Sequence, residues 1–245
     1  MRNTTIFGVF LASILVANCT QYAPIPPIPD GLKAGKGQDS EGLKLSFSAF
    51  YDLMCPDSKA GYAILKPLLP QFLSNPNFLF TIHFFPLVFH REAYTMSEAV
   101  HFIQKEFGPQ KAFEFIDLIF EHQEFFGTPE TYNRTRSQVE KQVYALVKDN
   151  LNLNISESQY LAGVRDSNND EASRISWKYA CSKGVTGTPI YFANGVKVDG
   201  AESFDAQGFK DFFGQFLGPQ NSESETESNE SISSLKKKLL LKKNN

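Results

Sequence analysis

The stretch LKLSFSAFYDLMCPDS, residues 43–58, decides the fold of this chain of 245 residues. Apolar and polar side chains alternate from Leu43 to Tyr51, which predicts a β-strand. Pro56 suits the first position of a helix, where its missing N–H costs no hydrogen bond, and Asp57 suits the positive end of the helix dipole. The sequence therefore places Cys55 between the end of a strand and the start of a helix.

This position favours the thiolate form of Cys55. The N-terminus of a helix presents unpaired N–H groups and about half a positive charge. We therefore expect Cys55 to be an accessible nucleophile, with the hydroxyl of Ser58 donating a hydrogen bond to its sulfur. The alternative is a small, inert, buried cysteine.

A second motif, Gly187-Thr188-Pro189, lies far along the chain and opens the apolar run Ile190–Ala193. A cis peptide bond before Pro189 would turn the chain sharply, and the proline has no N–H. Asn194-Gly195 follows, which is the strongest short signal for a β-hairpin.

A second alternating run, Phe78–Phe85, predicts a strand parallel to the first. The carboxyl ends of parallel strands meet at one edge of a sheet. We therefore expect His90 to lie near Cys55, where it could stabilise a thiolate or move a proton. His83 is expected to be packed inside the strand, and Cys181, in the middle of a helix, to be a core residue.

Helical patterns fill most of the remaining sequence. Residues 95–164 are expected to be helical, with capping-box spacing at Thr95 with Glu98 and at Ser137 with Glu140. A further helix is expected from about 170 to 183 and a closing one around residues 209–216. The four histidines are widely spaced and no cysteines are paired, so no metal site is predicted.

The two ends of the chain differ from its middle. Residues 1–19 are expected to be a secretory signal peptide, because Arg2 precedes a short apolar run and small residues. The Pro- and Gly-rich residues 20–42 are expected to be a linker. One domain is predicted over 43–218, with a helical insert at about 92–165. Residues 219–245, rich in Ser and Glu and then in Lys, are expected to be a disordered tail.

These features predict entry into the secretory pathway, either the endoplasmic reticulum lumen or secretion. Three glycan acceptor sequences fit that compartment: Asn133, Asn154 and Asn229. The apolar run of the leader is too short to span a bilayer, so no transmembrane span is expected. The net charge of −3 gives no reason to expect a nucleic-acid partner.

The predicted order is strand, helix, strand, helical insert, helix, hairpin, helix. It resembles the DsbA-like branch of the thioredoxin superfamily, an α/β class with a thioredoxin-like fold and an inserted helical subdomain. The runs Cys55–Ser58, 83–90 and 177–189 are similar to those of a eukaryotic DsbA-like group with a Cys-Pro-Asp-Ser site. The resemblance covers about residues 43–217. It implies catalytic roles for Cys55 and Ser58, and substrate contacts at Pro56, Asp57, His90, Thr188 and Pro189.

The resemblance also implies a function. In such a site Ser58 stands where a second cysteine would resolve a mixed disulfide, so that disulfide would persist until an outside thiol attacked it. We expect a monothiol thiol-disulfide oxidoreductase or isomerase that acts on lumenal or secreted proteins. It would need no cofactor, with glutathione a possible co-substrate. The alternatives are a non-catalytic module that binds or retains client proteins, and a glutathione-dependent transferase or isomerase that uses Ser58.

Overall fold

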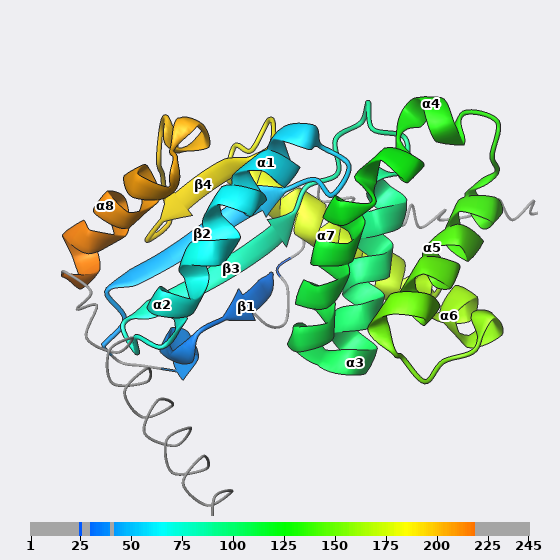
Figure 1. The fold of residues 1–245 in the computed structure, drawn as a ribbon, viewed down its shortest axis with the longest axis horizontal. Helices are drawn as coiled ribbons and strands as arrows, with labels where there is room; N and C mark the ends of the chain where they lie inside the picture. Colours follow the sequence, from blue (N-terminus) through cyan, green and yellow to red (C-terminus); the bar gives the residue numbers. More distant parts are fainter. Residues whose placement is uncertain (1–24, 26–29, 40–41, 219–245) are drawn as a thin grey trace, which may run out of the picture.

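The computed structural model describes residues 25, 30–39 and 42–218. A five-stranded sheet lies at its centre, in the order β1-β3-β2-β4-β5 (Figure 1). The neighbours β2 and β3 are parallel, and the other pairs are antiparallel. The strands are β1 (Leu32–Ala34), β2 (Leu45–Tyr51), β3 (Phe78–Phe84), β4 (Ile190–Ala193) and β5 (Val196–Lys197).

Helices cover the sheet and form the insert between β3 and β4. The α-helices are α1 (Pro56–Leu65), α2 (Leu69–Leu73), α3 (Ala93–Glu121), α4 (Thr128–Thr131), α5 (Arg136–Leu151), α6 (Glu157–Val164), α7 (Ser167–Ser182) and α8 (Ala206–Leu217). Short 3-10 turns are η1 (Lys36–Asp39), η2 (Lys66–Leu68), η3 (Gln123–Phe126) and η4 (Ala201–Ser203). Helices α3 to α6 gather to one side of the sheet (Figure 1), which confirms the predicted inserted helical subdomain.

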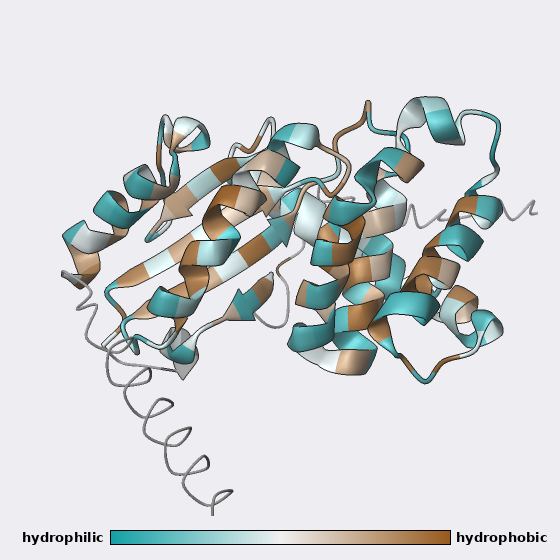
Figure 2. Cartoon of the chain, viewed as in Figure 1, coloured by the Kyte–Doolittle hydropathy of each residue, from teal (hydrophilic) through white to brown (hydrophobic). Residues whose placement is uncertain are grey.

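The two faces of the sheet bury different helices, because successive side chains of a strand point to opposite faces. On one face Phe47 of β2 meets Phe213 of α8 at 4.8 Å between ring centroids, and Phe213 also meets Phe72 of α2 at 4.9 Å. On the other face Phe50 of β2 stacks on Tyr179 of α7 at 6.2 Å. Figure 2 shows the apolar residues concentrated on the strands and on the helices beside them.

The segment predicted as a linker contains an edge strand, which corrects that part of the sequence analysis. Strand β1 pairs antiparallel with β3, with Leu32 opposite Ile82, and the side chain of Leu32 is fully buried. The glycines of this segment suggested flexibility. However, Gly31 has a φ of +108°, and a Cβ there would meet the His83 ring. Glycine is needed for the close approach of the backbone that starts β1.

The predicted capping boxes are wrong in position. The structure has them at Thr135 with Gln138 and at Ser156 with Gln159. Ser137 lies inside α5, two residues after its true cap, and Thr95 is buried in the first turn of α3. Spacing alone allows several neighbouring registers, so the sequence places the end of a helix only to within one or two residues.

Several predictions fall outside the described residues. They are the signal peptide 1–19, the tail 219–245 and the glycan acceptor Asn229. Among the residues that the structure describes, none of the helices has the length and apolar character of a membrane span.

Candidate functional site

Cys55 begins α1 at the carboxyl end of β2, as the sequence predicts. It occupies the N-cap position with φ −81° and ψ 123°, and Pro56 and Asp57 form the exposed first turn of the helix. The Cys55 N–H donates to the Asp52 carbonyl at 3.0 Å, and its own carbonyl accepts from Lys59 N–H at 3.1 Å. The thiol therefore sits at the positive end of α1.

The thiol of Cys55 is nearly buried, which corrects the expectation of an accessible nucleophile. The residue is only 4% exposed, and it packs with Phe50, Phe85, Leu87 and Phe192. Its sulfur donates a hydrogen bond to the carbonyl of Thr188 at 3.4 Å. A reagent therefore has little access to the sulfur in this conformation.

The loop before β4 supplies the other wall of the site. The peptide bond between Thr188 and Pro189 is cis. In the described part of the chain, no group accepts a hydrogen bond from the Thr188 N–H, and the buried Thr188 hydroxyl has no partner. Helix α1 approaches this segment closely at Gly61, where a Cβ would meet the Pro189 ring at 3.4 Å and the Tyr191 hydroxyl of β4 at 2.5 Å. The residue whose carbonyl accepts a hydrogen bond from the sulfur, Thr188, thus also carries an N–H and a hydroxyl without partners in the described part of the chain.

Ser58 is fully buried, and the hydrogen bond of its hydroxyl is not with the sulfur. Its hydroxyl oxygen accepts a hydrogen bond from the Asp52 N–H at 3.3 Å. Across the described residues no hydrogen bond joins Ser58 to Cys55, so the expected donation to the sulfur is not observed. Ser58 stabilises the turn that carries the cysteine.

Asp52 is a site residue that the sequence analysis missed. Its carboxylate is buried and accepts hydrogen bonds from Met54 N–H at 2.8 Å and Leu87 N–H at 3.0 Å. His90 Nδ1 lies 2.6 Å from the same carboxylate. Burial raises the pKa of Asp52 above its ordinary value, although the hydrogen bonds from His90, Met54 and Leu87 partly oppose that rise. An acid directly after a buried strand was the available signal.

Gln123 is a second missed residue. It lies in η3 of the helical insert, and its buried side-chain amide donates to the carbonyls of Leu53 at 2.9 Å and Cys55 at 3.0 Å. The helical insert therefore fixes the Cys55 turn directly. Nothing in the sequence marks this glutamine, because the contact joins residues about seventy positions apart.

The sequence predicts His90 near this edge and His83 inside the strand, and their surroundings differ. His90 lies in the loop after β3, as predicted, but its contact is with Asp52, and among the described residues it makes no hydrogen bond to Cys55. His83 is packed in β3, as expected, with its ring 4.6 Å from that of Phe50. It pairs with Asp30 at 2.8 Å.

Cys181 is exposed near the end of α7, so the expectation of a core residue is wrong. The helical pattern placed it correctly in a helix but on the wrong face. Within the described residues, neither it nor Cys55 forms a disulfide. The glycan acceptors Asn133 and Asn154 are exposed. No cluster of potential metal ligands occurs among the described residues.

Comparisons with known proteins concern the fold. No protein-family model matches the chain, and no curated protein is similar to it. Solved structures do match. Wolbachia pipientis alpha-DsbA1 has a TM-score of 0.61 and 16% identity, covering 78% of this chain and 93% of that one. The chain has a DsbA-like thioredoxin fold.

Two further neighbours have the same fold. Bacillus subtilis BdbD in its oxidised form has a TM-score of 0.60 and 16% identity, with 77% of this chain and 94% of that one covered. The thiol-disulfide exchange protein alpha-DsbA2 of Wolbachia pipientis has a TM-score of 0.56 and 16% identity, with 76% and 86% covered. At this identity the likeness concerns the fold.

Proposed function

We propose that the protein is a monothiol thiol-disulfide exchange protein that acts on client proteins of the secretory pathway through mixed disulfides. The observation that carries the proposal is the position of Cys55, at the N-terminus of α1 with its sulfur 3.4 Å from the Thr188 carbonyl. Neighbours of the same fold, among them a thiol-disulfide exchange protein, support it. The predicted leader and the exposed Asn133 and Asn154 support the secretory pathway.

The reaction conserves atoms and electrons without a cofactor. The Cys55 thiolate attacks one sulfur of a client disulfide, a Cys55–client disulfide forms, and the other client sulfur leaves as a thiolate. A second thiol of the client, or glutathione, then attacks the mixed disulfide and releases the Cys55 thiolate. When the client supplies that thiol, its disulfides are rearranged with no net oxidation.

Residues around the sulfur have distinct roles in this proposal. The free Thr188 N–H is suited to pair with the main chain of an extended client beside the sulfur. Asp52, Ser58 and Gln123 hold the turn that carries Cys55. The exposed Pro56 and Asp57 form the rim that a client meets first.

A second candidate function is a module that binds clients without covalent chemistry. The near-complete burial of Cys55 favours it, because a thiol that is 4% exposed reacts with large substrates only after local opening. A transferase that uses Ser58 has less support, since that hydroxyl is fully buried and already bonded to the Asp52 N–H.

Trapping of mixed disulfides separates these functions. The protein is incubated with a scrambled-disulfide client or with glutathione disulfide, quenched with acid and resolved on a non-reducing gel. Because Cys181 is itself an accessible thiol, the comparison is made on a Cys181→Ser background, where we expect adducts with Cys55 present and none when Cys55→Ser is added. Equal adducts with and without Cys55→Ser on that background would exclude Cys55 chemistry, and client binding without any adduct would establish the non-covalent module.

A further inference from the structure

A pocket separate from the thiol lies between the loop after β3, the start of α3, and α7. It has a volume of about 410 Å³ and is lined by Pro86, Val88, Tyr94, Arg174, Trp177 and Lys178, together with Leu87, His90 and Arg91. This volume is within the range of small-molecule sites. Cys55, Thr188 and Pro189 do not line it. Leu87 is shared by the pocket and by the apolar cluster that contains Cys55.

One side of the pocket is apolar and aromatic. Trp177 projects from α7 and stacks on Phe85 at 6.0 Å between ring centroids, with the two rings 10° from parallel. Pro86 and the strongly exposed Val88 continue this surface along the loop. A flat ring can lie against such a surface with a large gain in buried apolar area.

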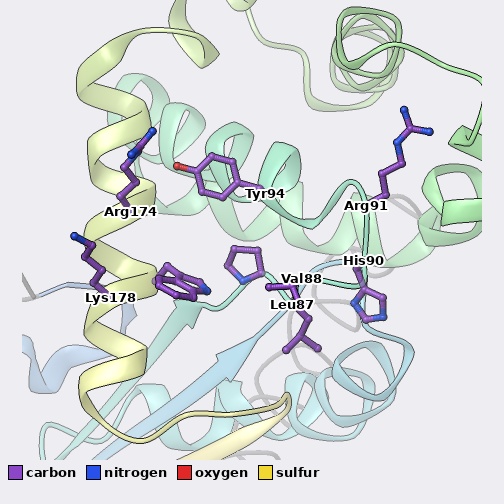
Figure 3. Close-up of a pocket in the computed structure, with 9 residues that line it drawn as sticks. Leu87, Val88, His90, Arg91, Tyr94, Arg174 and Lys178 are labelled. Atoms are coloured by element: carbon purple, nitrogen blue, oxygen red, sulfur yellow. The ribbon is translucent and has the colours of Figure 1, made fainter. Parts of the chain in front are cut away.

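The other side is cationic. Figure 3 shows Arg174 and Lys178 on successive turns of α7, with Tyr94 reaching toward them from α3. Arg174 uses its Nε for an ion pair with Asp170 at 2.7 Å and also interacts with the Tyr94 side chain, so its guanidinium is held at the pocket wall. Lys178 makes no hydrogen bond or ion pair among the described residues.

No acidic side chain of the described residues lines the pocket. Asp170 is the nearby acid, and it is already shared by Arg174 and the Tyr94 hydroxyl, which donates to it at 2.7 Å. The guanidinium of Arg91 is engaged elsewhere, because both of its terminal nitrogens donate to main-chain carbonyls of residues 131–134. It points away from Tyr94 and Arg174 in Figure 3.

We propose that this pocket binds a small aromatic carboxylate, with the ring against Trp177 and Pro86 and the carboxylate between Arg174 and Lys178. Two cations one helical turn apart, of which Lys178 has no partner among the described residues, suit the two oxygens of a carboxylate. The adjacent aromatic surface selects a ring over a short aliphatic acid. The carboxylate comes either from a free metabolite or from the C-terminal residue of a peptide.

Binding to this pocket can be followed by the fluorescence of Trp177, because it is the only tryptophan in the chain. Its fluorescence is titrated in the full protein with phenylacetate, with the neutral phenylacetamide, and with a short peptide that ends in phenylalanine. We expect a saturable change with phenylacetate and at least tenfold weaker binding of the amide. Binding of the peptide as tightly as phenylacetate identifies a C-terminus as the carboxylate source, and its exclusion identifies a free acid.

Variants complete the test. Lys178→Gln should weaken phenylacetate binding roughly three- to tenfold, the effect of losing one exposed charged contact. The matched exposed Lys210→Gln on α8 should leave it unchanged. Cys55→Ser should also leave it unchanged, so the result is independent of the proposed exchange activity. Absence of a saturable signal, equal binding of acid and amide, or equal binding by Lys178→Gln and wild type would overturn the proposal.

Discussion

Two aspartate–histidine pairs lie on the same sheet. One is a contact of the buried core, and the other lies at the candidate site. Asp30 and His83 lie 2.8 Å apart under α7, with side chains 8% and 4% exposed. Asp52 and His90 lie 2.6 Å apart at the carboxyl edge of β2 and β3, with side chains 0% and 21% exposed. The first pair is closed to solvent, while the second opens to it through His90.

The carboxyl groups of the two pairs respond differently to burial. Burial acts to raise the pKa of Asp30, but hydrogen bonds from His83 and Ser176 and the charges of His83 and His101 lower it overall. For Asp52, burial outweighs the hydrogen bonds from His90, Met54 and Leu87, and its pKa is raised. The core therefore stabilises the ionised form of Asp30. Burial disfavours the ionised form of Asp52, which lies three residues before Cys55.

The largest effect is expected on the free energy of unfolding, at Asp30. Asp30→Asn removes the charged acceptor of His83 and Ser176, so we expect the free energy of unfolding to fall by about 2–4 kcal/mol. The matched variant Asp199→Asn, at a side chain 87% exposed, should cost less than about 0.5 kcal/mol. Urea unfolding at neutral pH measures both. A loss below about 1 kcal/mol for Asp30→Asn would show that the pair is not a core contact.

The same comparison shows where the sequence was informative. Alternation located β2 and β3, and the order of Pro56 and Asp57 located the helix that begins after Cys55, because both signals are local. The parallel strands also placed His90 at the correct edge. Strand β1, the contacts of the Gln123 amide and the pairing of His90 with Asp52 could not be predicted from the sequence. Each depends on segments brought together only by packing, and no local pattern records such contacts.

The pH dependence of stability should have opposite signs at the two aspartates. The unfolded value is about 3.9 in both cases. The lowered pKa of Asp30 means that its contribution is complete above that value and is lost as the pH falls through the folded pKa. The raised pKa of Asp52 means that its contribution is present below the unfolded value and is lost as the pH rises through the folded pKa.

These signs are measured as the difference in unfolding free energy between wild type and each Asp→Asn variant. From about pH 3 to about pH 7 the difference should grow with pH for Asp30→Asn and shrink for Asp52→Asn, by about 1.4 kcal/mol for each unit of pKa shift. Urea unfolding across that range gives both curves. Differences that move in the same direction would show that the two carboxyl groups share one environment.

The smallest effect is expected at His90. Gln keeps a donor that can reach the Asp52 carboxylate, and His90 is partly exposed, so His90→Gln should change the free energy of unfolding by less than about 0.5 kcal/mol. Since the described structure shows no hydrogen bond from His90 to Cys55, the rate at which Cys55 forms a mixed disulfide with glutathione disulfide should change by less than about threefold, which corresponds to a change of roughly 0.7 kcal/mol in the barrier. The rate is measured on a Cys181→Ser background so that only one thiol of the described domain reacts.

His83→Gln is the matched control, and it should lose more stability because that ring is packed against Phe50 and Tyr179. A tenfold slower reaction of His90→Gln at unchanged stability would assign His90 a direct part in the thiol chemistry, and the second pair would then belong to the mechanism as well as to the architecture of the site.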